Sequence, residues 1–209
     1  MITKPSKQKN SDYTISLDIK PENTIVISPI GDFDAEITES VKNGIRSIYG
    51  FPATILPLLE NAGFAFDSLR NQYHSTPILE KLESFAPPFA IKVLAIIEVD
   101  LFIPVLTHVY GEAQLGGRTC IVSTCRLKSS FLPARINGSH IQRIVKEAIH
   151  ELGHTFNLRH CREQSCIMHY CRTELDVDRK SDQLCRYCKI LLEDEIKRLK
   201  KHGSEEKPC

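Results

Sequence analysis

The chain of 209 residues is 42% hydrophobic and 25% charged, which is typical of one globular domain with short tails. Its formal net charge of +1 at pH 7 argues against nucleic acid or a membrane surface as a partner. No apolar run approaches the roughly 18 residues that span a bilayer, and the first residues lack the apolar core of a signal peptide. We therefore expect a cytoplasmic protein, monomeric by default, whose 8 cysteines serve metal binding rather than disulfides.

The expected elements follow one another in the order of an α/β (α+β) fold. Polar composition marks residues 1–20 as an N-terminal tail, 21–200 as the domain and 201–209 as a C-terminal tail. Apolar runs predict strands, and helical spacing predicts helices. The strands are Thr24–Ile30, Ala53–Leu58, Ile91–Val99 and Arg118–Leu127, the helices are Asp34–Tyr49 and one from Thr76-Pro77 onward, and Gly63–Tyr73 is a loop. Strands interrupted by helices indicate a twisted mixed sheet.

From Gly138 the apolar residues recur at helical spacing. One stripe consists of Ile141, Ile144, Val145, Ala148, Leu152 and Phe156. At about 100° per residue, His150 and His154 lie on the side of this helix opposite the centre of the stripe. A structural histidine would lie on or beside the buried stripe. These two are therefore expected to face a cleft that the helix lines.

The same helix carries the pattern of a catalytic metal site. His150 and His154 are one turn apart and can bind one cation, and Glu151 is placed to contact a metal-bound water rather than the metal. Zinc that catalyses hydrolysis needs three protein ligands and one open position. His160 is the expected third ligand, provided that the chain turns back at Asn157. Asn tolerates the left-handed conformation better than most residues other than Gly.

A second group of ligands follows directly. Cys161, Cys166, Cys185 and Cys188 form a C-x4-C…C-x-x-C set, which suits a closed, tetrahedral, structural zinc. Cys185 and Cys188 are three residues apart at the start of a C-terminal helix, so the metal would tie this helix to the loop after His160. Disulfides or free buried thiols are the alternative. The remaining cysteines are expected to be plain thiols: Cys120, Cys125, Cys171 and Cys209.

The run HELGHTFNLRH resembles the zinc motif HExxHxxGxxH of the metzincin metallopeptidases, and the cysteines after it resemble the archaemetzincins within that clan. In that family C-x4-C-x-M and then C-x-x-C follow, as Cys161, Cys166, Met168, Cys185 and Cys188 do here. Asn157 departs from the family's Gly. The resemblance implies a metzincin-like single domain with an active-site helix and a C-terminal helical subdomain that a four-cysteine zinc holds. It also implies Zn²⁺ at two sites per chain, one catalytic and one structural.

The resemblance further implies hydrolysis of short peptides, with aminopeptidase activity as one form of it. Glu151 would act as general base on a zinc-bound water. Met168 would be the residue below the histidines, and Tyr170 a switchable zinc ligand or transition-state donor, with a structural tyrosine as the alternative. An extended peptide substrate would lie antiparallel to an edge strand, for which Arg118–Ser123 is the expected segment.

Two other interpretations remain open. In the first, the four-cysteine site is structural and the histidine site is vestigial or empty, so the protein only binds zinc. The intact Glu151 argues against this, because a vestigial site does not need a general base. In the second, a downstream carboxylate such as Glu174 replaces His160 as third ligand. The basic run Lys197–Lys201 is expected to be the solvated end of a helix and not a nucleic-acid site.

Overall fold

The computed structural model describes residues 23–128 and 137–205. Its strands are β1 (Thr24–Ile30), β2 (Ala53–Ile55), β3 (Phe66–Asp67), β4 (Gln72–His74), β5 (Ala90–Ile97), β6 (Leu101–Phe102), β7 (Gly111–Ala113) and β8 (Thr119–Ser123). Its α-helices are α1 (Ala35–Tyr49), α2 (Ser75–Phe85), α3 (Asn137–Thr155), α4 (Glu174–Arg179) and α5 (Arg186–Glu205). Short 3₁₀ helices lie at Gly63–Ala65 and Cys125–Leu127.

The main sheet has the strand order β2-β1-β5-β8-β7. The pairs among β2, β1, β5 and β8 are parallel, and β7 joins β8 antiparallel at one edge. A smaller sheet has the order β3-β4-β6. The described part of the chain therefore forms the mixed α/β architecture that the sequence predicts.

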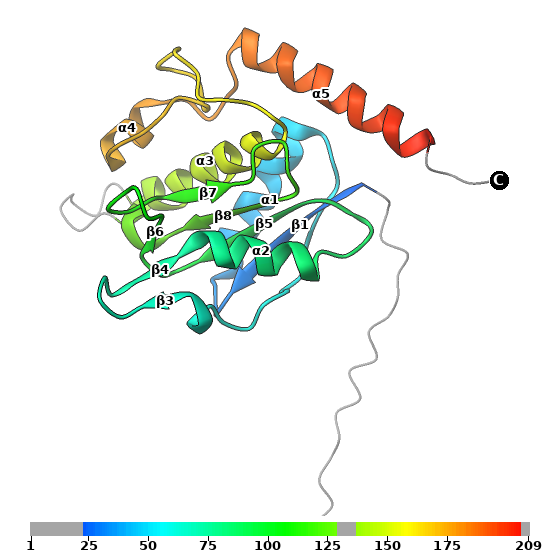
Figure 1. Cartoon of the computed structure of the whole chain (residues 1–209). Helices are drawn as coiled ribbons and strands as arrows, with labels where there is room; N and C mark the ends of the chain where they lie inside the picture. The colour runs from blue at the N-terminus through cyan, green and yellow to red at the C-terminus, as the bar shows by residue number, and fades with distance from the viewer. Residues whose placement is uncertain (1–22, 129–136, 206–209) are drawn as a thin grey trace, which may run out of the picture.

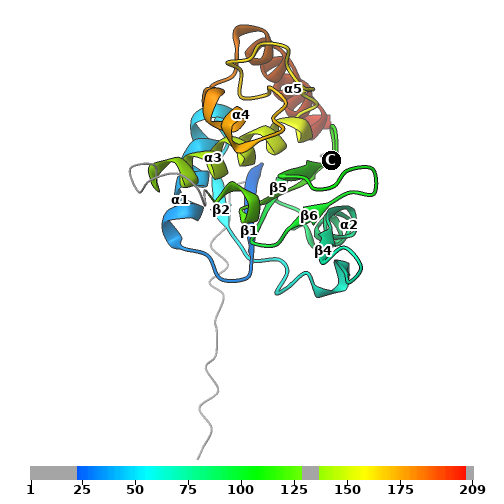
Figure 2. The same ribbon diagram turned by 90° about the vertical axis from the view of Figure 1, so that its left-hand side faces the viewer.

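Helices cover both faces of the main sheet, which is why its central strands are almost wholly buried. α1 and α3 pack on one face and α2 on the other, while α4 and α5 lie beyond α3, away from the sheet (Figures 1 and 2). Successive residues of β1 point to opposite faces: Ile25 and Ile27 join the core below α1 and α3, and Val26 joins the core around α2. α3 is thus held between the sheet and the C-terminal segment.

Several element boundaries are confirmed and others were wrong. α1 begins after Asp34, whose side chain accepts a hydrogen bond from the Glu36 amide, and ends at the left-handed Gly50. The expected strand Arg118–Leu127 was too long, because Thr124 has helical backbone angles and a 3₁₀ helix follows. Cys120 and Cys125 therefore do not share a strand. The expected loop Gly63–Tyr73 contains the 3₁₀ helix Gly63–Ala65, β3 and part of β4.

The predicted tails can be compared with the two ends of the described chain. The expected tail 1–20 lies outside the described residues. α5 runs to Glu205, past the expected boundary at residue 200. None of the helices within 23–128 and 137–205 combines the length and the apolarity that crossing a membrane requires.

Candidate metal centres and active-site cleft

The three predicted histidines converge. His150 and His154 come from α3 and His160 from the segment after it, and their ligand atoms lie within 4.8 Å of one another. The two Nε2 atoms of His150 and His154 are 3.1 Å apart. Two nitrogens on one tetrahedral zinc at ~2.1 Å would be about 3.4 Å apart. The donor atoms therefore fit a zinc ion.

Backbone carbonyls fix the orientation of two of these rings. The Nδ1 atom of His150 lies 2.9 Å from the Ile167 oxygen, and that of His154 lies 2.7 Å from the Leu158 oxygen. Each Nδ1 then carries the proton and donates, which leaves Nε2 with a free lone pair. Burial lowers the pKa of His150 well below its ordinary value and that of His154 to about 4. Neutral imidazole is the form that binds a metal.

Asn157 makes the turn that brings His160 back to α3. Its φ of 62° is left-handed. The Asn157 amide donates to the His154 oxygen at 2.9 Å, and the Leu158 amide donates to the Gly153 oxygen at 3.0 Å. This pair of bonds is a Schellman motif, in which the left-handed position is usually Gly. Asn157 thus adopts a left-handed backbone conformation at the position where the zinc motif HExxHxxGxxH has Gly.

Met168 packs against α3 at Gly153, which precedes His154 in the chain. It is fully buried, and a Cβ atom at Gly153 would lie 2.5 Å from its sulfur. The absence of a side chain at Gly153 therefore lets Met168 approach α3 closely. Tyr170 is 45% exposed, and its ring centroid lies 5.0 Å from that of His160. It stands at the rim of the histidine group and lines the same cleft.

A buried ion pair lies behind His150, and the sequence did not suggest it. Lys180 is buried, and its Nζ lies 2.7 Å from a Glu147 carboxylate oxygen and 3.5 Å from the His150 Nδ1. One turn earlier on α3, Arg143 binds Asp178 of α4 through two hydrogen bonds of 2.7 and 2.5 Å. These contacts hold α4 and the residue after it against the polar side of α3. The only sign of this ion pair in the sequence was that two charged residues, Arg143 and Glu147, precede His150 at helical spacing.

Glu151 lies against the edge of the sheet. It is 7% exposed and lines the same cleft as the histidines. Burial, followed by repulsion from Glu147, raises the pKa of Glu151 well above its ordinary value. A Cβ atom at Gly111 would lie 2.5 Å from the Glu151 Cγ and 2.5 Å from the Ile121 carbonyl oxygen. Gly111 thus leaves the space in which the Glu151 side chain lies.

Replacement of Gly111 by Ala is therefore expected to lower kcat for the peptide hydrolysis that the sequence predicts by on the order of 100-fold, because it displaces Glu151, the expected general base. Zinc content should stay that of the unmodified protein. Steady-state kinetics with a fluorogenic peptide and metal analysis test this. Gly63→Ala, in a 3₁₀ helix outside the cleft, is the matched control and should retain kcat. A Gly111→Ala protein with unchanged kcat would contradict this role for the glycine.

The cleft has a volume of about 370 Å³. Its floor is the face of α3 that carries His150, Glu151 and His154. One side is formed by the chain from Ile103 to Ala113 and the other by residues 170–172. The cleft is therefore bounded on one side by β7 and the segment before it.

The expected substrate strand, Arg118–Ser123, was wrong. β8 lies between β5 and β7, so both of its edges are already paired. The strand at the edge is β7, which was not predicted because it has 3 residues. Tyr110 and Gln114 bond to β8, at 2.7 and 3.1 Å. By the alternation of antiparallel pairing, the backbone groups of Gly111 and Ala113 point away from β8, and both residues line the cleft.

The four predicted cysteines also converge. The sulfur atoms of Cys161, Cys166, Cys185 and Cys188 lie within 4.8 Å of one another. Those of Cys161 and Cys185 are 3.8 Å apart, far beyond a disulfide bond of about 2.05 Å and close to the separation that ~2.3 Å bonds to one tetrahedral zinc would give. The Cys185 amide donates to the Cys166 sulfur at 3.3 Å. The geometry fits a closed four-sulfur zinc site.

The other expected or alternative ligands lie outside both groups. Cys120, Cys125 and Cys171 are free thiols that belong to neither cluster. Cys209 is outside the described residues. Glu174 is the first residue of α4 and is not part of the histidine group.

A helix that carries two of three converging histidines beside an open edge strand is the arrangement of a metzincin-like zinc metallopeptidase. The model of Peptidase family M54 matches residues 23–194, and the chain belongs to this family. The archaemetzincin of Methanocaldococcus jannaschii is 35% identical over 171 residues, which are 81% of this chain and 93% of that protein. That of Halobacterium salinarum is 34% identical over 166 residues, 78% of this chain and 95% of that protein.

Comparison with solved structures leads to the same kind of protein as comparison with these relatives. The crystal structure of archaemetzincin from Methanopyrus kandleri gives a TM-score of 0.72 at 30% identity, covering 84% of this chain and 96% of that one. A zinc-dependent peptidase from Methanocorpusculum labreanum gives 0.72 at 28% identity, with 80% and 99% covered. The resemblance found in the sequence is confirmed, and the chain is a zinc metallopeptidase.

Proposed function

We propose that this chain hydrolyses short peptides, including removal of N-terminal residues, with one catalytic zinc at His150, His154 and His160 and one structural zinc at the four cysteines. The observation that carries the proposal is the convergence of three histidine ligand atoms within 4.8 Å on the floor of a cleft. Free thiols at Cys161, Cys166, Cys185 and Cys188, which the structural site needs, suit a cytoplasmic protein.

A zinc ion bound by the histidines would supply a Lewis acid that polarises the substrate carbonyl and lowers the pKa of water. Glu151 accepts the proton from the attacking water and passes it to the leaving amine. Its position supports this role, because Glu151 is buried in the cleft beside His150 and His154 and a carboxylate shielded from water is a stronger base. The carbonyls at Ile167 and Leu158 keep His150 and His154 in the tautomer that leaves Nε2 free. Tyr170, at the rim, would donate to the developing oxyanion.

The substrate backbone binds along β7. Gly111 and Ala113 have outward backbone groups and line the cleft, so an extended peptide can add to the sheet there as an antiparallel strand. Because Glu151 lies against Gly111, we expect the bond to be cleaved beside the first residue of β7. Peptide substrates are thereby held mainly through their backbone.

Replacement of His160 by Ala separates this proposal from a site completed by Glu174. Loss of a hydrogen-bond partner of a metal-binding histidine costs about 10- to 100-fold in metal affinity or activity, so loss of a ligand is expected to cost more. His160→Ala should therefore lose peptidase activity and one zinc, whereas Glu174→Ala should keep both. Metal analysis and peptide cleavage test this pair. If His160→Ala kept its zinc and activity while Glu174→Ala lost them, the three-histidine site would be wrong.

A protein that binds zinc without catalysis is the second candidate. It predicts that the four-cysteine zinc is present and that no peptide is cleaved even after zinc is added. The buried Glu151 beside the histidines favours the peptidase, because burial of a carboxylate without a task is unfavourable.

A further inference from the structure

Lys92 lies on β5 and is buried, with an exposed fraction of 4%. Leu94 and Ile96, which share its face of the strand, belong to the core below α1 and α3, so the Lys92 side chain points to that side of the sheet. We propose that Lys92 is a positioning residue, which keeps β7 in register with the histidine-bearing helix α3 by joining the turn after β7 to the end of that helix. This rests on the proposed peptidase function.

Lys92 binds two backbone carbonyls from different elements. Its Nζ atom donates to the Gly117 oxygen at 2.7 Å and to the Thr155 oxygen at 2.6 Å. Gly117 belongs to the turn between β7 and β8, and Thr155 is the last residue of α3. The last carbonyls of a helix have no partner within it, and a cation at this end also interacts favourably with the helix dipole. Lys92 therefore satisfies one of these carbonyls and ties it to the turn, as a bridge between the two.

The bridge is made by a charged group. Burial lowers the pKa of Lys92 to about 8, so most of the molecules still carry the proton at pH 7. The Nζ atom also lies 4.9 Å from the centroid of the Phe156 ring, within the range of a cation–π interaction. Hydrogen bonds from an ionised donor are stronger than those between neutral groups. A neutral side chain at this position would hold the two carbonyls less firmly.

The same turn also contacts α3 directly. The Gly116 amide donates to the His154 oxygen at 2.9 Å, and Gly116 has a left-handed φ of 67°. A Cβ atom at Gly116 would lie 3.6 Å from the Asn157 Oδ1. Because Lys92 holds the next residue of the turn, Gly117, loss of its bonds would loosen the turn against His154 and against the residue at which the chain turns back.

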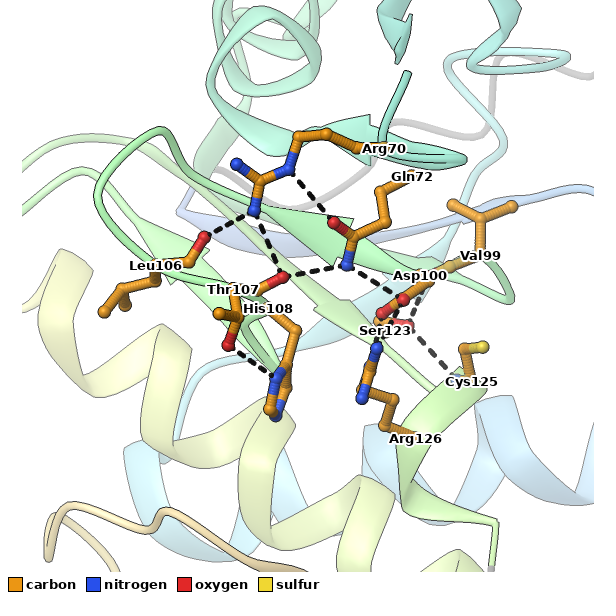
Figure 3. Close-up of polar contacts among 10 residues, drawn as sticks. All are labelled: Arg70, Gln72, Val99, Asp100, Leu106, Thr107, His108, Ser123, Cys125 and Arg126. Carbon is orange, nitrogen blue, oxygen red and sulfur yellow. Dashed lines mark hydrogen bonds and ion pairs between the residues drawn. The ribbon is translucent and has the colours of Figure 1, made fainter. Parts of the chain in front are cut away.

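The segment before β7 is anchored to another part of the molecule. Arg70 donates to the Leu106 oxygen at 2.8 Å. Gln72 donates to the Thr107 oxygen and to the Asp100 carboxylate, both at 2.9 Å. Figure 3 shows these side chains as one connected network. Since Gln72 is the first residue of β4, the network fixes this segment relative to the smaller sheet, and other contacts set the position of β7 relative to α3.

β7 meets α3 at both of its ends. At its start, Gly111 leaves the space in which the Glu151 side chain lies, and beyond its end Lys92 and Gly116 tie the turn to α3. A strand of 3 residues has few bonds of its own to resist a shift of that turn. In catalysis, a misplacement of about 1 Å can cost about 100-fold in rate. Loss of the bridge is therefore expected to lower kcat, while a peptide can still bind along β7.

The test compares Lys92→Met with Lys146→Met, both loaded with zinc. Lys146 of α3 is the matched control, because its Nζ atom also donates to backbone carbonyls. These are the oxygens of Val177, Asp178 and Lys180, at 3.0, 3.1 and 2.7 Å. Steady-state kinetics with a fluorogenic peptide should give a kcat about 100-fold lower for Lys92→Met, with KM within a few-fold and zinc content unchanged. Lys146→Met should keep kcat within a few-fold, although both variants leave carbonyls unpaired and lose stability.

Hydrogen exchange adds a readout that needs no turnover. The Gly116 amide should exchange severalfold faster in Lys92→Met than in the unmodified protein or in Lys146→Met, because the turn is held less firmly. Circular dichroism checks that the variants fold. Lys92→Gln, which is neutral and polar, takes the place of Lys92→Met if the latter does not fold, and the same changes in kcat and exchange are expected of it.

A folded Lys92 variant with the kcat and the Gly116 exchange of Lys146→Met would overturn the inference. An equal loss of kcat in both lysine variants would also overturn it, because it would reflect stability alone. The proposed function is tested separately by the unmodified protein. Cleavage that does not depend on Lys92 contradicts only the bridge. Faster exchange at Gly116 in Lys92→Met, with no cleavage by the unmodified protein, supports the bridge and contradicts the peptidase.

Discussion

Replacement of Glu151 by Gln is expected to lower kcat for peptide hydrolysis by at least about 100-fold, the lower end of what a general base contributes. Gln has nearly the same shape but cannot accept the proton of the attacking water. Since Glu151 is not a ligand in the proposed site, zinc content should stay unchanged. Single-turnover cleavage of a fluorogenic peptide, combined with metal analysis, measures both quantities.

The control for this experiment is Glu112→Gln. Glu112 lies on β7, near Glu151, but its carboxylate accepts hydrogen bonds from Ser75 and Thr76 and does not line the cleft. Its loss should leave kcat within a few-fold of the unmodified protein. A Glu151→Gln protein that cleaved peptides as fast as Glu112→Gln would contradict the proposed mechanism.

Replacement of Cys188 by Ser is expected to remove one zinc and to lower the free energy of unfolding by at least about 3 kcal/mol, because structural zinc sites contribute directly to folding. Cys188 is 3% exposed and lies on the first turn of α5, so its site joins that helix to the loop after α3. Cys161 directly follows His160. Loss of the cysteine site should therefore weaken catalytic zinc binding as well.

Urea denaturation and metal analysis of Cys188→Ser measure these effects. Cys125→Ala is the control, because Cys125 belongs to neither cluster and is not fully buried. It should keep its zinc content and its stability within about 1 kcal/mol. A Cys188→Ser protein with two zinc ions and unchanged stability would show that the cysteines are not a zinc site.

The two groups of metal-binding side chains could be predicted from the sequence because their members lie close together along it. His150 and His154 are one helical turn apart, and His160 needs only one left-handed residue, which Asn157 supplies with its φ of 62°. The cysteines form two short pairs on adjoining segments. In both groups, the local conformation of the chain determines most of the arrangement of the ligands.

The edge of the sheet could not be predicted in this way. β7 has 3 residues, too few for a period to be recognised, and its place beside β8 depends on pairing between distant segments. The same holds for the contact of Lys180 with Glu147, because the sequence does not tell that α4 folds back onto α3. The role of Gly111 could not be predicted either, because it depends on the contact of this glycine with the Glu151 side chain.

Metal content per chain is the most direct test of two separate zinc sites on one polypeptide. It should be measured for the unmodified protein and for the double variant His150→Ala/His154→Ala, after both are loaded with zinc and freed of excess metal. We expect two zinc ions in the first and one in the second, which should keep its fold. One zinc in both proteins, or none in the double variant, would contradict separate catalytic and structural sites.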